Sequence, residues 1–195
     1  MEKGKIIFLN GVSSVGKTTL AKALQLQLDE PYYIFNTDMF LGTGVMLPEK
    51  FTTYDTAGWK FMLKTLSGMH NTIKLYSDMG MNVIVDHVLT NSVLDKDPKA
   101  LEECVELLHE SPVLFVHVTC PLHELRRREK ERSDRQIGQA EAQLPTLVPS
   151  DISVYDLSVD TFQNTKAECV EKITEMLDTP EKHRAFNILW AQRTR

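Results

Sequence analysis

The most restrictive pattern in this sequence is an eight-residue run near its start, Gly11-Val12-Ser13-Ser14-Val15-Gly16-Lys17-Thr18. The run fits G-x-x-x-x-G-K-S/T without a mismatch, and it lies between an apolar run and a segment with helical spacing of leucine and alanine. The two fixed glycines let the backbone wrap around phosphate oxygens, and the N-terminal end of the following helix attracts negative charge. A glycine-rich turn that matches by chance is the alternative, but the motif requires a strand before it and a helix after it, and both are predicted here. The run therefore predicts a phosphate-binding loop, the P-loop.

The P-loop also predicts which groups hold a nucleotide. We expect Lys17 to reach the β- and γ-phosphates and the Thr18 hydroxyl to ligate Mg²⁺. With ATP as the nucleotide, the residues expected to bind it in and beside the loop are Gly11, Ser13, Ser14, Val15, Gly16, Lys17, Thr18 and Thr19.

Apolar runs alternate with helical patterns along the chain. Strands are predicted at residues 5–10, 32–35, 82–85, 113–118 and 157–159. Helices are predicted at residues 17–28, 59–79, 101–108, 121–131 and 165–177, with another after Pro180. This alternation indicates βαβ units and a mostly parallel sheet that is covered on both faces. We expect a three-layer α/β fold of the P-loop NTPase and kinase class, with five strands and one domain over residues 1–195.

Composition narrows the class of partner. The chain has 195 residues and a net charge of −5, which is a poor match for a protein that wraps duplex nucleic acid. No apolar run approaches the roughly 20 residues that span a bilayer, and residues 6–9 are too short for the core of a signal peptide. Three widely spaced cysteines contain no CxxC and suggest neither a disulfide framework nor a zinc site. We expect a reduced, cytoplasmic protein without a membrane or nucleic-acid partner, either monomeric or homo-oligomeric.

One segment departs from the acidic background. Residues 124–135 carry six basic and four acidic side chains, a net charge of +2, while the rest of the chain carries −7. Arg128 and Arg132 lie four apart on a predicted helix, and Arg135 follows in a predicted loop. A solvated helix face with mixed ion pairs is the alternative. Together with the P-loop, the pattern favours an arginine-rich lid over about 124–147 that closes over phosphates and excludes water.

Two carboxylates are expected at the ends of parallel strands, where ligands bind in such sheets. Asp38 follows the second predicted strand, and Asp86 ends the third. Asp38 is the candidate for accepting a proton from an acceptor hydroxyl, although it could instead be the N-cap of a short helix. Asp86 is expected to bind the acceptor or to contact Mg²⁺ through water. His87 receives no role.

Two further motifs, if present, would indicate nucleotide hydrolysis instead of phosphoryl transfer. We find no N-K-x-D motif, which a GTPase uses to read its base. The apolar run 83–85 ends in Asp86-His87, without the glutamate that usually polarises the attacking water in motor ATPases. Transfer to a bound acceptor is therefore favoured.

The sequence resembles the chloramphenicol phosphotransferase-like family of P-loop kinases. Residues 6–18 are similar to the family's I-I-x-L-N-G-x-S-S-x-G-K-S. The resemblance covers most of residues 5–177 and continues at Asp38, 83–86, 118–120, 128–135, Gly138 and the Tyr-Asp-x-x-x-Asp-Thr stretch at 155–161.

The resemblance implies an ATP- and Mg²⁺-dependent kinase that phosphorylates a hydroxyl of a small molecule, an antibiotic in the founding member. Asp38 matches the proposed general base, and the lid arginines match Arg128, Arg132 and Arg135. We expect catalysis by Asp38, Lys17 and Arg135, and acceptor binding by Asp38 and Asp86. Three departures leave the acceptor open: the family's Asp-Asp pair is Asp86-His87, an expected histidine is Pro149, and residues 39–80 show little similarity.

Two other functions fit the same motifs. A nucleoside or nucleotide kinase shares the fold and the lid. A binding module that uses ATP as a switch shares the P-loop but does not need Asp38 or the arginines.

Overall fold

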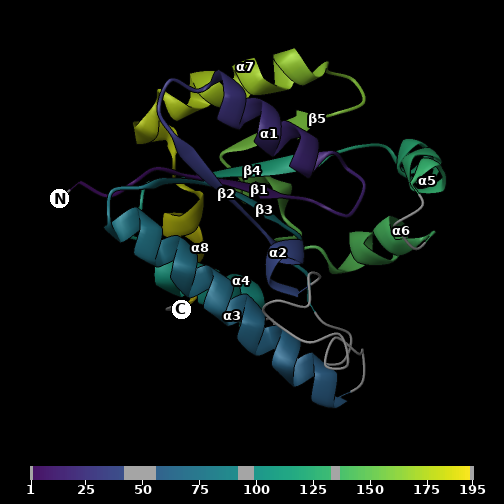
Figure 1. The fold of residues 1–195 in the computed structure, drawn as a ribbon, viewed down its shortest axis with the longest axis horizontal. Helices are drawn as coiled ribbons and strands as arrows, with labels where there is room; N and C mark the ends of the chain where they lie inside the picture. Colours follow the sequence, from purple (N-terminus) through teal and green to yellow (C-terminus); the bar gives the residue numbers. More distant parts are fainter. Residues whose placement is uncertain (1, 42–55, 92–98, 133–136, 194–195) are drawn as a thin grey trace.

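Five parallel strands form the centre of the fold, in the order β2-β3-β1-β4-β5 (Figure 1). The computed structural model describes residues 2–41, 56–91, 99–132 and 137–193. The strands are β1 Ile6–Asn10, β2 Tyr32–Asn36, β3 Asn82–His87, β4 Val113–Thr119 and β5 Leu157–Asp160. All five lie where the apolar runs predict them, and the sheet is parallel throughout.

Helices connect the strands. They are α1 Lys17–Gln27, α2 Thr37–Leu41, α3 Thr56–Asp78, α4 Lys99–Leu108, α5 Leu122–Glu131, α6 Gln139–Gln143, α7 Lys166–Leu177 and α8 Ala185–Arg193, with 3₁₀ turns at Leu144–Thr146, Ile152–Val154 and Pro180–Lys182. The predicted helices are confirmed, whereas the short α2 and α6 had no periodic signal. Most of the unreadable stretch 42–58 lies outside the described residues. No helix in the described ranges has the length and apolar character of a membrane span.

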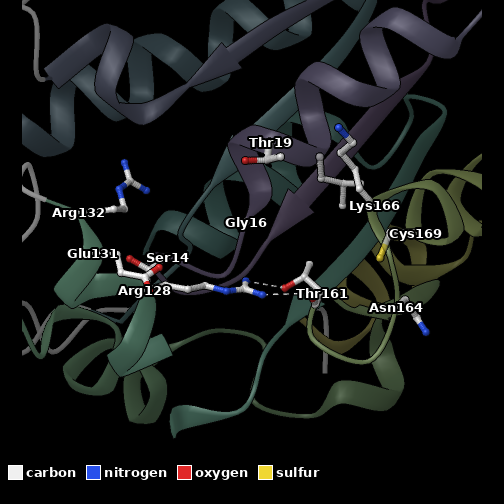
Figure 2. A pocket seen from close by; sticks show the side chains of 11 residues that line it. Ser14, Gly16, Thr19, Arg128, Glu131, Arg132, Thr161, Asn164, Lys166 and Cys169 are labelled. Atoms are coloured by element: carbon white, nitrogen blue, oxygen red, sulfur yellow. Dashed lines mark hydrogen bonds between the residues drawn. The ribbon is translucent and has the colours of Figure 1, made fainter. Parts of the chain in front are cut away.

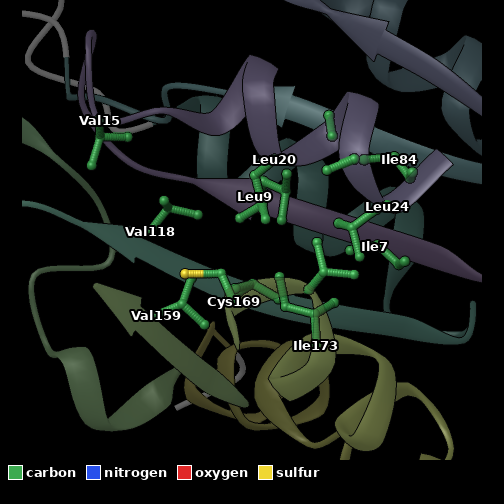
Figure 3. Close-up of a cluster of buried hydrophobic side chains, with 14 of the residues drawn as sticks. Ile7, Leu9, Val15, Leu20, Leu24, Ile84, Val118, Val159, Cys169 and Ile173 are labelled. Atoms are coloured by element: carbon green, nitrogen blue, oxygen red, sulfur yellow. The ribbon is translucent and has the colours of Figure 1, made fainter. Parts of the chain in front are cut away.

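The sheet is covered on both faces (Figure 1). Helices α1 and α7 lie on one face, and α3, α4 and α8 lie on the other. Every residue of β1 is buried, because alternate side chains of a central strand enter opposite cores. Ile7 and Leu9 join the core under α1 and α7, which Figure 3 shows, while Ile6 and Phe8 join the other core. The expected three-layer α/β fold is confirmed.

The strand register brings the candidate site together. Leu9 of β1 pairs with Asp86 of β3, and Asp86 in turn pairs with Asn36 of β2. The carboxyl ends of β1, β2 and β3 therefore lie side by side, so the P-loop, α2 and Asp86 meet at one edge of the sheet. Strand β3 continues two residues beyond the apolar run that predicts it, because this ladder extends through His87. Asp86 thus lies within the strand and not after it.

The carboxylate of Asp156, in the Tyr-Asp stretch, accepts hydrogen bonds from three backbone N–H groups. Its Oδ1 accepts hydrogen bonds from the N–H groups of Arg184 at 2.6 Å and Ala185 at 2.9 Å, at the start of α8. Its Oδ2 accepts a hydrogen bond from the N–H of Phe115 in β4 at 2.9 Å. One carboxylate therefore caps α8 and joins it to the sheet.

Asp156→Ala is expected to lower the free energy of unfolding by about 2–3 kcal/mol, because hydrogen bonds to charged groups are lost and buried N–H groups lose their partner. Urea denaturation followed by circular dichroism measures this change. The matched control is Asp151→Ala, which removes only the exposed cap of a single turn. A loss no larger for Asp156→Ala than for the control would contradict the assignment.

Candidate functional site

The P-loop joins β1 to α1, and both of its fixed glycines are required sterically. A Cβ at Gly11 would lie 2.4 Å from the carbonyl oxygen of Val118. Gly16 has φ of 102° and Ser14 has φ of 61°, so the backbone turns twice into the left-handed region. Successive N–H groups in such a turn form a concave anion site at the N-terminal end of α1.

Lys17, the first residue of α1, lies buried beneath the loop. Its Nζ donates hydrogen bonds to the carbonyl oxygens of Gly11 at 2.9 Å and Val12 at 3.0 Å. The same Nζ lies 3.7 Å from Oδ1 of Asp86. These contacts hold a positive charge beside the carboxyl end of β3.

Thr18 and Asp86 form the second contact between the loop and β3. The Thr18 hydroxyl donates to Oδ2 of Asp86 at 2.6 Å, and Asp86 is only 8% exposed. A hydroxyl and a carboxylate are hard oxygen donors, which suit Mg²⁺ when phosphates and water complete its coordination. Across the described ranges, no group of three or more His, Cys, Asp or Glu side chains forms a metal cage. The donor set thus fits a cation that arrives with a nucleotide.

Asp38 lies in the first turn of α2 and lines a cleft of about 90 Å³ that opens onto the P-loop. The described residues that line this cleft are Ser13, Ser14, Gly16, Lys17, Thr18, Thr19, Asn36, Thr37, Asp38, Asp86, Val88 and Arg132. The structure therefore brings together both predicted carboxylates, the lysine and the threonine.

Asn36, not Asp38, caps α2. The Oδ1 of Asn36 accepts a hydrogen bond from the N–H of Met39 at 2.8 Å, which is the usual contact of an N-cap residue. The alternative that Asp38 is the N-cap is therefore wrong. An Asx residue directly before the helix is the sequence signal that identifies Asn36.

A larger cavity of about 360 Å³ lies along the other side of the P-loop (Figure 2). It shares Ser14, Gly16, Thr19 and Arg132 with the cleft at Asp38. Its remaining lining residues are Leu20, Arg128, Glu131, Thr161, Asn164, Lys166 and Cys169. The two spaces therefore meet along the loop, and each borders Arg132.

Arg128 braces the P-loop against the end of β5. Its Nη1 donates to the carbonyl oxygen of Val15 at 3.2 Å and to Oγ1 of Thr161 at 3.0 Å, and its Nη2 donates to the Thr161 carbonyl at 3.0 Å (Figure 2). The Thr161 hydroxyl itself donates to the Val15 carbonyl at 2.6 Å. The threonine of the Tyr-Asp-x-x-x-Asp-Thr stretch thus supports the loop directly.

The basic segment divides into two kinds of arginine. Arg126 and Arg127 are exposed and form surface ion pairs with Glu141 and Glu131, and Arg127 also pairs with the buried Glu124. Hydrogen bonds from Arg127 and Arg128 lower the pKa of Glu124 to about 2. Arg128 and Arg132 border the cavities, while Arg135 lies outside the described residues. The interpretation of the segment as a solvated helix face therefore holds for Arg126 and Arg127, and it does not hold for Arg128 and Arg132.

Helix α6 also touches the P-loop, which the sequence did not predict. The Oε1 of Gln143 accepts a hydrogen bond from the N–H of Ser13 at 2.7 Å. The buried carboxylate of Glu129 accepts hydrogen bonds from the N–H groups of Gly138 at 2.8 Å and Ala140 at 2.7 Å, so it anchors the start of α6 to α5. The described part of the predicted lid is therefore fastened to the loop at Ser13 and Val15. Only the tertiary arrangement reveals these contacts.

Two of the three departures from the family pattern, His87 and Pro149, lie in the described part of the chain close to β1 and β3. His87 is buried at the end of β3, and burial lowers its pKa well below the ordinary value. Pro149 follows a cis peptide bond from Val148, whose carbonyl oxygen accepts a hydrogen bond from Asn10 at 2.8 Å.

Comparison with known proteins places this geometry in context. A family model described as chloramphenicol phosphotransferase-like protein matches residues 4–178. Two relatives from Mycobacterium tuberculosis, strains CDC 1551 / Oshkosh and ATCC 25618 / H37Rv, are named as candidate O-phosphotransferases. Each is 30% identical over 210 residues, which cover 97% of this chain and 89% of the relative.

Solved kinase structures share the fold. The APS kinase CysC of Mycobacterium tuberculosis, in complex with AMPPNP and APS, superposes with a TM-score of 0.67 at 16% identity, over 91% of this chain and 99% of that chain. A gluconokinase from Sinorhizobium meliloti 1021 gives 0.61 at 18% identity, over 98% of both chains. The tunicamycin resistance protein of Deinococcus radiodurans gives 0.64 at 16% identity, over 90% of this chain and 96% of that chain. At these identities the likeness shows the fold alone.

The family match begins before β1 and ends just after α7, so it takes in the P-loop, both carboxylates and the described lid helices. A phosphotransferase is the class of activity that this family supports. The chain belongs to the chloramphenicol phosphotransferase-like family.

Proposed function

We propose that the protein is an ATP- and Mg²⁺-dependent phosphotransferase that moves the γ-phosphoryl group of ATP to a hydroxyl of a small molecule. The observation that carries the proposal is the position of Asp38, which shares one cleft with Lys17, Thr18 and Asp86. A carboxylate facing a phosphate-binding loop suits a reaction in which an acceptor hydroxyl is deprotonated beside the γ-phosphate.

The two cavities suggest how ATP would bind. The larger cavity beside Arg128 and Thr161 has room for the base, and the P-loop between the cavities would hold the α- and β-phosphates. The γ-phosphate would then enter the smaller cleft, with Lys17 on one side and Arg132 at the rim. We propose that Arg135 also contacts the phosphates, as the resemblance implies.

In the proposed reaction, the Asp38 carboxylate takes the proton of the acceptor hydroxyl. The hydroxyl oxygen bonds to the γ-phosphorus as the bond from that phosphorus to the bridging oxygen breaks, which leaves ADP. Lys17 and the lid arginines stabilise the charge on the transferring oxygens. Thr18 and Asp86 would hold Mg²⁺, which supplies further charge neutralisation when bound.

A panel of acceptors tests the proposal. The protein is incubated with ATP, Mg²⁺ and one of chloramphenicol, gluconate, a nucleoside or adenosine 5′-phosphosulfate, and ADP and phosphorylated product are both measured. We expect equal amounts of ADP and product with at least one acceptor, and loss of both after Mg²⁺ is removed with EDTA. A nucleoside that outcompetes the other alcohols would favour a nucleoside kinase. Tight ATP binding without any phosphorylated product would overturn the proposal in favour of a nucleotide-dependent binding module.

A further inference from the structure

A pair of buried histidines joins α3 to the end of β3. His70 has no exposed surface and His87 is 2% exposed. Their Nε2 atoms lie 2.9 Å apart, and the other ring nitrogen of His70 lies 3.3 Å from Oε2 of Glu103 in α4. Ser67 donates a hydrogen bond to the second oxygen of the same carboxylate. Three elements are thus connected through polar groups inside an otherwise apolar core.

The chemistry of imidazole fixes how many protons this contact can hold. Two Nε2 atoms at hydrogen-bond distance need one proton between them, so one ring donates and the other accepts. The Glu103 carboxylate calls for a proton on the ring nitrogen of His70 that faces it, because a carboxylate oxygen can only accept. His70 therefore donates to Glu103 from Nδ1, and one proton lies between the two Nε2 atoms. The ring of His87 stacks on Phe8 with a centroid distance of 5.9 Å.

The pair connects the two walls of the cleft that contains Asp38 and Asp86. His87 directly follows Asp86 in β3, so the pair is attached at the wall that contacts Thr18 and Lys17. His70 belongs to α3, which packs against α2, the helix that carries Asp38. Phe40 of α2 lies in the same buried cluster as Met69 of α3. The distance between the Asp38 and Asp86 carboxylates therefore depends on the position in which α3 packs against β3.

The free energy of burying imidazoles indicates what the His70–His87 contact contributes. Two buried imidazoles cost free energy unless they are hydrogen-bonded, and an apolar pair of similar volume would stabilise the core at least as well. An apolar pair, however, fixes no single register between the helix and the strand, whereas a hydrogen bond has a preferred length and direction. The pair is thus better suited to fixing geometry than to adding stability.

We propose that His70 and His87 are positioning residues, which set the distance between Asp38 and Asp86 and so align the acceptor with the γ-phosphate. This inference rests on the proposed phosphoryl transfer. The two side chains act through the carboxylates, and neither of them touches the reactants.

Nuclear magnetic resonance tests the hydrogen bond in the unmodified protein. Long-range ¹H–¹⁵N spectra of the imidazoles should show that one of the two Nε2 atoms is protonated and the other is not, with the shared proton shifted downfield by the hydrogen bond. Two neutral rings that share no proton would overturn the inference.

Kinetics test the consequence, with His70→Leu, the double variant His70→Leu/His87→Leu, and His70→Gln, whose amide can still donate to His87. The acceptor is the one transferred fastest in the panel. We expect His70→Leu and the double variant to lose about tenfold or more in kcat, with KM for ATP within about twofold of wild type. The double variant should regain most of the stability lost in His70→Leu, because it leaves neither imidazole unpaired. His70→Gln should keep at least half of the wild-type kcat.

Ile173→Ala is the matched control, because Ile173 is fully buried in α7 on the opposite face of the sheet. It should lower stability and leave kcat at 25 °C unchanged. A double variant with wild-type kcat would overturn the inference, and so would a kcat that follows stability in all variants, including the control. Wild-type protein that phosphorylates no acceptor would count against the proposed function itself, so the two failures are distinguishable.

Discussion

Asp38→Asn is expected to lower kcat for transfer to a hydroxyl acceptor by about 10²–10⁴-fold, the usual contribution of a general base. The amide has nearly the same shape as the carboxylate but cannot take the acceptor's proton. Asp38 lies on the wall of the cleft that faces the P-loop, and it makes no part of the loop itself. Binding of ATP should therefore be retained.

Two measurements separate these effects. Product formation at saturating ATP and acceptor gives kcat, and calorimetry with AMPPNP gives nucleotide affinity. Asp78→Asn is the control, since this exposed carboxylate pairs with Lys74 at the far end of α3 and should leave both quantities unchanged. If Asp38→Asn transferred phosphate at the wild-type rate to a genuine acceptor, Asp38 would not be the base.

Lys17→Met is expected to lower kcat/KM for ATP by about 10³-fold, because it removes the charge that would stabilise the β- and γ-phosphates in the transition state. The side chain is 6% exposed, and its ammonium group is held by two loop carbonyls and by the nearby Asp86. Methionine fills the same space without the charge or the donors. Both nucleotide affinity and turnover should therefore fall.

Lys22→Met is the matched control, because Lys22 is an exposed lysine on the same helix. Steady-state kinetics over a range of ATP concentrations gives kcat/KM, and circular dichroism verifies that both variants fold. Equal kcat/KM values for Lys17→Met and Lys22→Met would remove Lys17 from the proposed site.

The parts of the structure that could be predicted from sequence are those with local signals. Apolar runs predicted the described strands, because strands buried on both faces of a sheet are apolar throughout. Apolar residues at helical spacing predicted the long helices that cover the sheet. The P-loop could be predicted for a similar reason, since its glycines and lysine are consecutive in sequence. Asp38 and Asp86 could be placed at one edge because parallel strands align their carboxyl ends.

Contacts between segments far apart in sequence could not be predicted. Gln143 accepts from Ser13, and His70 meets His87, only because the fold brings separate helices to the same strand end. Neither a lone glutamine nor a lone histidine has a recognisable local pattern. The lid had a local signal in its charge, but the structure was needed to separate arginines in surface ion pairs from those that border the cavities.

The central place of β1 has a consequence for how such a protein can change in evolution. On one side of this strand, α5, α7 and the residues after β5 line the larger cavity, and on the other side β2, α2 and β3 carry Asn36, Asp38 and Asp86 along the smaller cleft. Both sides border the P-loop, and the two spaces share Ser14, Gly16, Thr19 and Arg132. In the proposed reaction, substitutions on the side of β2, α2 and β3 could therefore change the acceptor while the P-loop and the larger cavity stay unchanged.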